Sequence, residues 1–147
     1  MTRTAPPAPN VCTAARVRKA SRRVTQIYDR HLAPFDLTIA QFGLLAQLRE
    51  VSGASVGELA DRMIMDATTL SRNLRPLERR GLIMAEADRD DGRVRKLKLT
   101  AAGRALVQRA AAGWRGAQKQ VEQALGGAAQ MRALNDALDD AIHKLAI

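Results

Sequence analysis

The sequence predicts a mainly α-helical protein with one small β-hairpin. Of its 147 residues 46% are hydrophobic but only 3% are aromatic, so the core must be built from aliphatic side chains that favour helices. Apolar residues recur at helical spacings of three and four along most of the chain. Within residues 94–99, Lys96 and Lys98 instead alternate with Leu97 and Leu99, after an Asp-Gly turn signal. A chain of this length fits one domain with a substantial core.

The first two helices are predicted by apolar spacing and by a cap. After a Pro-rich tail at residues 1–10, we expect the first helix from about residue 11 to residue 32, with its apolar side chains on one face. The second helix begins at Thr38, which pairs with Gln41 in a T-x-x-Q capping box. Ser52 and Gly53 end it.

The third and fourth helices are predicted to follow one another closely. Residues 55–62 repeat the capping pattern, with Glu58 three positions after a serine. Residues 66–80 begin with an Asp cap and end before Gly81. Pro76 inside this helix removes one backbone donor and is expected to bend the last turn without ending the helix.

The remaining elements are a hairpin and two helices. We expect strands at residues 82–86 and 94–99, joined through a turn at Asp91-Gly92. Thr100 caps a long fifth helix that Gly126-Gly127 ends, and a sixth helix follows. The complete order is four helices, a hairpin and two helices, with a winged helix-turn-helix in the middle.

The fourth helix carries the pattern of a DNA-reading helix. Its core-facing residues are expected to be Ala67, Leu70, Leu74 and Leu77, which leaves a basic stripe within about 60° on the opposite side. An α-helix fits the major groove of B-DNA, where arginine can donate two hydrogen bonds to guanine and a threonine methyl can contact thymine. The candidate DNA-binding residues of this helix are Thr68, Thr69, Arg72, Asn73, Arg75 and Arg79.

The hairpin tip carries further candidates for contact with DNA. An arginine on a wing can enter the narrow, electronegative minor groove while nearby carboxylates hold its guanidinium in position. Arg89 and Arg93 are the candidate minor-groove residues, with Asp91 beside them. Ser55, at the start of the third helix, completes the candidate set.

Three motifs together resemble the multiple-antibiotic-resistance regulator (MarR) family. They are the run at residues 55–62, the T-T-L-x-R-x-L-x-x-L-E-x-x-G-L helix, and the wing followed by L-x-L-T-x-x-G at residues 97–103. The resemblance implies a homodimeric transcription factor, commonly a repressor, that binds a pseudo-palindromic operator in double-stranded DNA. By position, Asp91 and Arg93 match the ends of the family's Asp-Arg-Arg wing pattern, whereas Gly92 replaces the middle arginine.

The sequence also predicts which segments bind DNA and which form the dimer. We assign residues 36–100 to DNA binding, and residues 11–35 together with 101–147 to dimerisation. The sixth helix has one apolar face that needs a cover, which the first helix or a second copy of the chain could supply.

The sequence is compatible with two kinds of signal that would release the protein from DNA. The resemblance implies an effector that binds between the dimerisation helices and the DNA-binding region, bordered by Tyr28, His31, Phe42, Met63 and Trp114. Each of these side chains is also explained as an ordinary core residue. The alternative signal is an oxidant that reacts with Cys12, whose thiolate Arg16 could stabilise. Tyr28 is the single tyrosine of the chain, so the tyrosine pair that supports such a thiolate in peroxide-sensing relatives is absent.

Composition limits the other function classes. The formal charge is +9, and residues 1–35 hold seven of the 24 basic residues but one acidic residue, which favours a polyanionic partner. A DNA-binding architectural protein without sequence preference is therefore an alternative. Two histidines, one cysteine and no phosphate-binding glycine loop argue against an enzyme, and we expect neither cofactor nor metal. The longest uncharged runs have twelve residues, too short to span a membrane. The first residues lack an apolar stretch of signal-peptide type and the single cysteine makes no internal disulfide, so we expect a cytoplasmic protein.

Overall fold

The computed structural model describes residues 11–146, and the predicted tail at residues 1–10 lies outside this range. The described part contains six α-helices, one 3-10 turn and three short strands, which confirms a mainly helical fold with a small wing. In chain order the elements are α1 (Thr13–Leu32), η2 (Ala33–Phe35), α2 (Ile39–Glu50), β1 (Ala54–Ser55), α3 (Val56–Arg62), α4 (Ala67–Arg79), β2 (Ile83–Ala87), β3 (Arg95–Leu99), α5 (Ala101–Leu125) and α6 (Ala128–Lys144).

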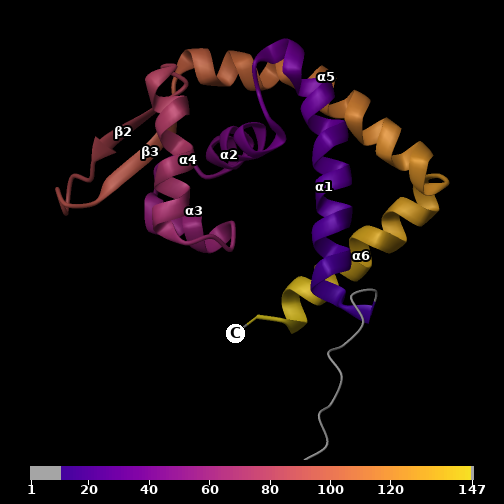
Figure 1. Ribbon diagram of the computed structural model, residues 1–147. Coiled ribbons are helices and arrows are strands. Elements are labelled where there is room, and N and C mark those ends of the chain that lie inside the picture. Colours follow the sequence, from indigo (N-terminus) through magenta and orange to yellow (C-terminus); the bar gives the residue numbers. More distant parts are fainter. Residues whose placement is uncertain (1–10, 147) are drawn as a thin grey trace, which may run out of the picture.

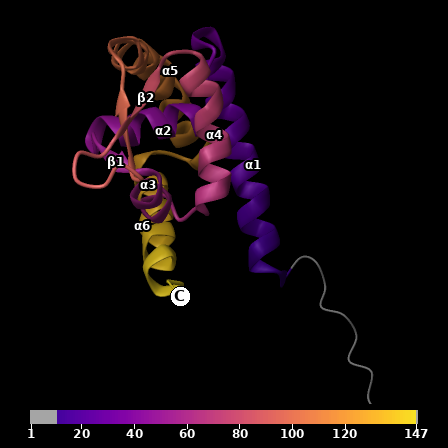
Figure 2. The same ribbon diagram turned by 90° about the vertical axis from the view of Figure 1, so that its left-hand side faces the viewer.

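The elements form two groups that α5 connects. Figure 1 shows α2, α3, α4 and the strands in one lobe, while α5 runs from this lobe to the other side of the molecule and leads into α6. The helix α1 packs against α5. Figure 2, in which the wing side of Figure 1 faces the viewer, shows the wing at the left and α4 between the wing and α1.

The main hydrophobic cluster holds α4 in place. Leu70, Leu74 and Leu77 of α4 are buried in it, as predicted. Ala67 is exposed, so its predicted place in the core was wrong. The reason is its position in the first turn of α4, directly after the cap residue and outside the cluster. The other elements of this lobe supply mainly leucines to the same cluster.

The wing is a three-stranded antiparallel sheet in the order β1-β3-β2. The short β1 pairs with β3 through Ala54 opposite Leu97 and Ser55 opposite Lys96, which ties the wing to the start of α3. Sequence reasoning missed β1 because two residues show no periodicity. The hairpin also differs from the prediction: residues 88–94 form a loop, in which the Asp88 N–H donates to the Val94 carbonyl at 2.8 Å.

The start of α5 packs tightly against the segment that connects α4 to the wing. The Thr100 hydroxyl donates to the Gly81 carbonyl at 2.6 Å, and its oxygen accepts the Gly103 N–H at 3.0 Å. The Thr100 N–H donates to the Leu82 carbonyl at 3.1 Å. A Cβ atom placed on Gly103 would lie 2.0 Å from that same carbonyl oxygen. The L-T-x-x-G motif therefore requires glycine for a steric reason.

The second group of helices is packed less completely. Tyr28 of α1 is buried against Ala117 and Val121 of α5 in a small separate cluster. No residue described in α6 is buried, and its apolar residues Leu134, Leu138 and Ile142 are exposed. No helix within residues 11–146 is both long and apolar enough to cross a membrane.

Candidate nucleic-acid interface

The start of α4 is fixed by its cap residue, Asp66. One carboxylate oxygen accepts the Thr69 N–H at 2.8 Å and the other accepts the Thr69 hydroxyl at 2.5 Å. These hydrogen bonds from Thr69 hold the pKa of the Asp66 carboxyl below its usual value. The cap therefore fixes the orientation of the Thr69 side chain. Its hydroxyl group is used in the hydrogen bond to Asp66, and its methyl group is not.

Asp66→Ala is expected to lower the free energy of unfolding by about 1 kcal/mol, because two donors at the helix start lose their acceptor. Urea denaturation followed by circular dichroism measures this loss. Asp90→Ala is the matched control, since the Asp90 side chain accepts none of the hydrogen bonds found in residues 11–146. Equal unfolding midpoints for the two variants would contradict a stabilising cap.

The candidate face of α4 is open to solvent. Thr68, Arg72, Arg75 and Arg79 are exposed, while Thr69 and Asn73 are partly buried at its sides. The helix continues through Pro76 and ends at Arg79, and Gly81 follows the cap residue with a φ of +68° that suits glycine. The predicted stripe of threonine and arginine therefore faces outward, and the leucine face holds it on the lobe.

Two grooves join α4 and α3 to the wing. One has a volume of about 260 Å³ and is bordered by Arg75 and Arg95. The other has about 390 Å³ and is bordered by Ser55, Arg93 and Arg95. The structure thus brings Ser55 and Arg93 to one groove.

Sequence reasoning missed Arg95. A signal was available, because Arg95 shares its strand face with the buried residues Leu97 and Leu99, which point toward the lobe. At the end of the strand the same face reaches the edge of the lobe, where the arginine side chain is exposed beside Arg75.

The wing loop is shaped by carboxylates that bind the backbone. Asp88 accepts the N–H groups of Asp90 and Asp91 at 2.8 and 3.1 Å, and Asp91 accepts the Arg93 N–H at 3.0 Å. The ion pairs found in the described residues include neither Arg89 nor Arg93, so a carboxylate that holds these guanidinium groups in position remains a prediction. The carboxylates set the course of the loop, and both arginine side chains are exposed at its tip.

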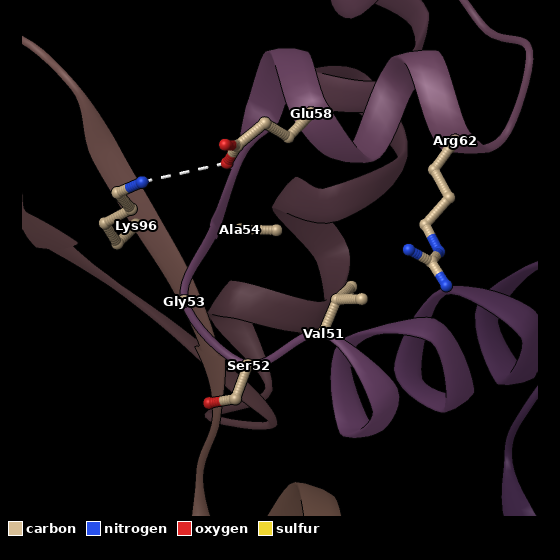
Figure 3. A pocket seen from close by; sticks show the side chains of 7 residues that line it. All are labelled: Val51, Ser52, Gly53, Ala54, Glu58, Arg62 and Lys96. Atoms are coloured by element: carbon tan, nitrogen blue, oxygen red, sulfur yellow. Dashed lines mark ion pairs between the residues drawn. The ribbon is translucent and has the colours of Figure 1, made fainter.

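A further groove of about 400 Å³ lies where β1 meets α3 and β3. Figure 3 shows its seven lining residues, with Lys96 pointing across to Glu58 and Arg62 on the far side. The Lys96 Nζ lies 3.7 Å from a Glu58 carboxylate oxygen. The same oxygen accepts the Ser55 N–H at 2.6 Å and thereby caps α3.

The five residues predicted to border an effector site are not gathered in one place within the chain. Phe42 and Met63 belong to the main hydrophobic cluster. Tyr28 donates a short hydrogen bond to Gln118, and His31 lies 2.8 Å from Gln120, so both side chains face α5. Trp114 is 37% exposed. A shared site for them remains a prediction.

Cys12 is an exposed free thiol at the start of α1. Sixteen residues separate it from Tyr28, which is about 24 Å along a helix. The two side chains of one chain therefore cannot meet. Within residues 11–146 no cluster of His, Cys, Asp or Glu has the geometry to hold a metal ion.

Known proteins resemble most of the chain. The model of the MarR family matches residues 35–94. The structure of the Mycobacterium tuberculosis transcriptional regulator MosR in complex with DNA is 36% identical in sequence, with a TM-score of 0.78 over 92% of this chain and 99% of that chain.

Curated relatives give the same family signal over a shorter range. An uncharacterised HTH-type transcriptional regulator of Bacillus cereus is 32% identical over 95 residues, which are 65% of this chain and 63% of that protein. An HTH-type transcriptional repressor of Mycobacterium bovis is 37% identical over 90 residues, 61% of this chain and 65% of that protein. The matched region therefore spans somewhat less than two thirds of these relatives.

Proposed function

Because the chain belongs to the MarR family of winged helix-turn-helix regulators, we propose that it is a sequence-specific DNA-binding transcriptional repressor and not an enzyme. The observation that carries this proposal is the exposed face of α4, where Thr68, Arg72, Arg75 and Arg79 lie together above a buried leucine face. In this function α4 reads base edges in the major groove, and the wing contacts the adjacent minor groove or backbone. Residues 36–100 form the DNA-binding region.

The repressor acts as a homodimer on a pseudo-palindromic operator. Support comes from the apolar residues that one chain leaves uncovered: Val17 of α1 is 51% exposed, and it borders a groove of about 580 Å³ together with Leu138, Ile142 and Leu145. A second copy that covers this surface removes its apolar side chains from water. Two-fold symmetry then places the two copies of α4 about 34 Å apart, one turn of DNA. Residues 11–35 and 101–147 are the dimerisation region.

Release from DNA is triggered by a small molecule, for which aromatic acids are the first candidates, that binds between the dimerisation helices and the DNA-binding region. Among the candidate residues Trp114 is exposed and His31 and Met63 are partly buried, while the buried Tyr28 and Phe42 complete the proposed border. Oxidation of Cys12 is the alternative trigger, supported by the exposure of its thiol.

In vitro selection of bound DNA by the purified protein tests the proposal. We expect an enriched sequence with two-fold symmetry, protected as one discrete footprint. Uniform weak protection without an enriched sequence would contradict specific binding and favour an architectural protein. Repeating the footprint with a panel of aromatic acids and with peroxide distinguishes the two triggers. In a Cys12→Ser variant we expect the response to peroxide to be lost and any response to an aromatic acid to be kept.

Arg89→Ala is expected to flatten the salt dependence of operator binding. Each phosphate contact that is lost lowers the slope of log K against log salt by about 0.9. Titrations at four salt concentrations measure the slope. Arg49→Ala is the charge-matched control, because Arg49 is exposed at the end of α2 and pairs with Glu50 at 3.4 Å. A slope equal to that of the wild type would assign Arg89 to solvent.

A further inference from the structure

The wing can support DNA reading only if it keeps a defined position relative to α3 and α4. Its loop is built on Asp88, which accepts two backbone N–H groups through Oδ1. The other oxygen, Oδ2, lies 3.7 Å from the Nζ atom of Lys96. The side chain that shapes the loop is therefore also paired with a lysine on the neighbouring strand.

The same lysine reaches the helix-turn-helix. Its Nζ lies 3.7 Å from Oε2 of Glu58, the oxygen that closes the capping box of α3 with the Ser55 N–H. Figure 3 shows Lys96 pointing from β3 toward Glu58 across the intervening groove. Lys96 also stands opposite Ser55 in the pairing of β1 with β3. One ammonium group thus lies between two carboxylates, each of which orders the backbone of a different element.

We propose that Lys96 is a positioning residue that fixes the wing loop relative to the start of α3 through its ion pairs with Asp88 and Glu58. In this role Lys96 makes no contact with DNA and acts through the placement of Arg89 and Arg93. The inference rests on the proposed DNA-binding function for its effect on affinity, but its structural part does not depend on that function.

The charges around Lys96 are consistent with this role. Backbone N–H groups of Asp90 and Asp91 lower the pKa of Asp88 most, and Lys96 lowers it further. The pKa of Glu58 is lowered first by hydrogen bonds from Ser55 and then by Lys96. Both partners are therefore carboxylates at neutral pH. Ion pairs of 3.7 Å whose side chains keep 23–63% of their surface in water contribute little to global stability, so their removal changes local position more than unfolding.

Lys98 provides a matched control on the same strand. Its Nζ pairs with Glu86 Oε2 at 2.8 Å, and β2 and β3 are already joined to each other as one hairpin. Lys98→Met and Lys96→Met therefore remove the same charge from the same strand. Of the two changes, Lys96→Met breaks the pairs that reach the loop and α3.

The test compares Lys96→Met, Lys96→Arg and Lys98→Met in the full-length protein. Hydrogen exchange of the free protein is read at the Asp90 and Asp91 amides, and binding is titrated on the selected operator at several salt concentrations. For Lys96→Met we expect faster exchange at both amides and a loss of affinity of about three- to tenfold, with an unchanged salt slope. Lys96→Arg should restore both properties, and Lys98→Met should leave the exchange as in the wild type.

Two results would overturn the proposal. Unchanged exchange at Asp90 and Asp91 in Lys96→Met would mean that Lys96 does not hold the loop. A salt slope lowered by about 0.9 with unchanged exchange would identify Lys96 as a phosphate contact instead. If the wild type selects no operator, the proposed function fails, while the exchange experiment still tests whether Lys96 positions the wing.

Discussion

Replacing Gly103 with alanine is expected to lower the free energy of unfolding by about 3 kcal/mol, the upper end for an overpacked site. The added Cβ would lie 2.0 Å from the Leu82 carbonyl oxygen and 3.3 Å from a methyl carbon of Leu99. The carbonyl cannot move freely because it accepts the Thr100 N–H. The change would separate α5 from the start of β2, and urea denaturation measures the loss.

Gly43→Ala is the control for this prediction. Gly43 lies inside α2 with a negative φ, and an added Cβ there meets no atom within 4 Å. Alanine in an unobstructed helix position stabilises by about 0.5–1 kcal/mol relative to glycine. The two substitutions should therefore shift the unfolding midpoint in opposite directions. A stabilised Gly103→Ala variant would contradict the prediction, because it would mean that a Cβ atom fits between α5 and the Leu82 carbonyl.

Arg72→Ala is expected to weaken specific binding to the selected operator by roughly 1–3 kcal/mol and to relax the preference at one base position. Arg72 lies in the middle of the exposed face of α4, one turn after Thr68 and one turn before Arg75 and Pro76. From this position its guanidinium can donate two hydrogen bonds to one guanine. Competition titrations against operators with single base changes measure both effects.

Arg72→Lys separates base reading from charge. Lysine keeps the positive charge but lacks the planar fork that pairs with guanine in two places. We expect this variant to keep the salt slope of the wild type while losing most of the base preference. Affinity and preference equal to the wild type in Arg72→Ala would remove Arg72 from the reading face.

The elements that local chemistry specifies were predictable from the sequence. The capping boxes at Thr38 and Ser55 and the cap at Asp66 are formed as expected, since each requires only side chains three residues apart. The leucine spacing of α4 likewise determines which face is buried. Because burial of one face exposes the other, the placement of Arg72 and Arg79 followed from the same pattern.

Features that depend on contacts between distant segments were not predictable. The strand β1 exists because Ala54 and Ser55 pair with β3, more than 40 positions later in the chain, and two residues carry no strand pattern. The wing loop is longer than a two-residue turn because Asp88 binds the backbone after it. Lys96 acquires its surroundings through the same long-range pairing, so the sequence alone did not single it out, whereas Arg95 could have been found from the strand face that it shares with Leu97 and Leu99.

Because α6 has no buried residue, the measured stability of the protein is expected to depend on its concentration. A helix with no buried residue gains little from its own chain, and short-range helix propensity alone is marginal in water. If a second copy supplies the missing contacts, association and folding are linked by mass action. The melting temperature should then rise with total protein concentration. The amount of regulator in a cell would set its lifetime as well as its occupancy of DNA.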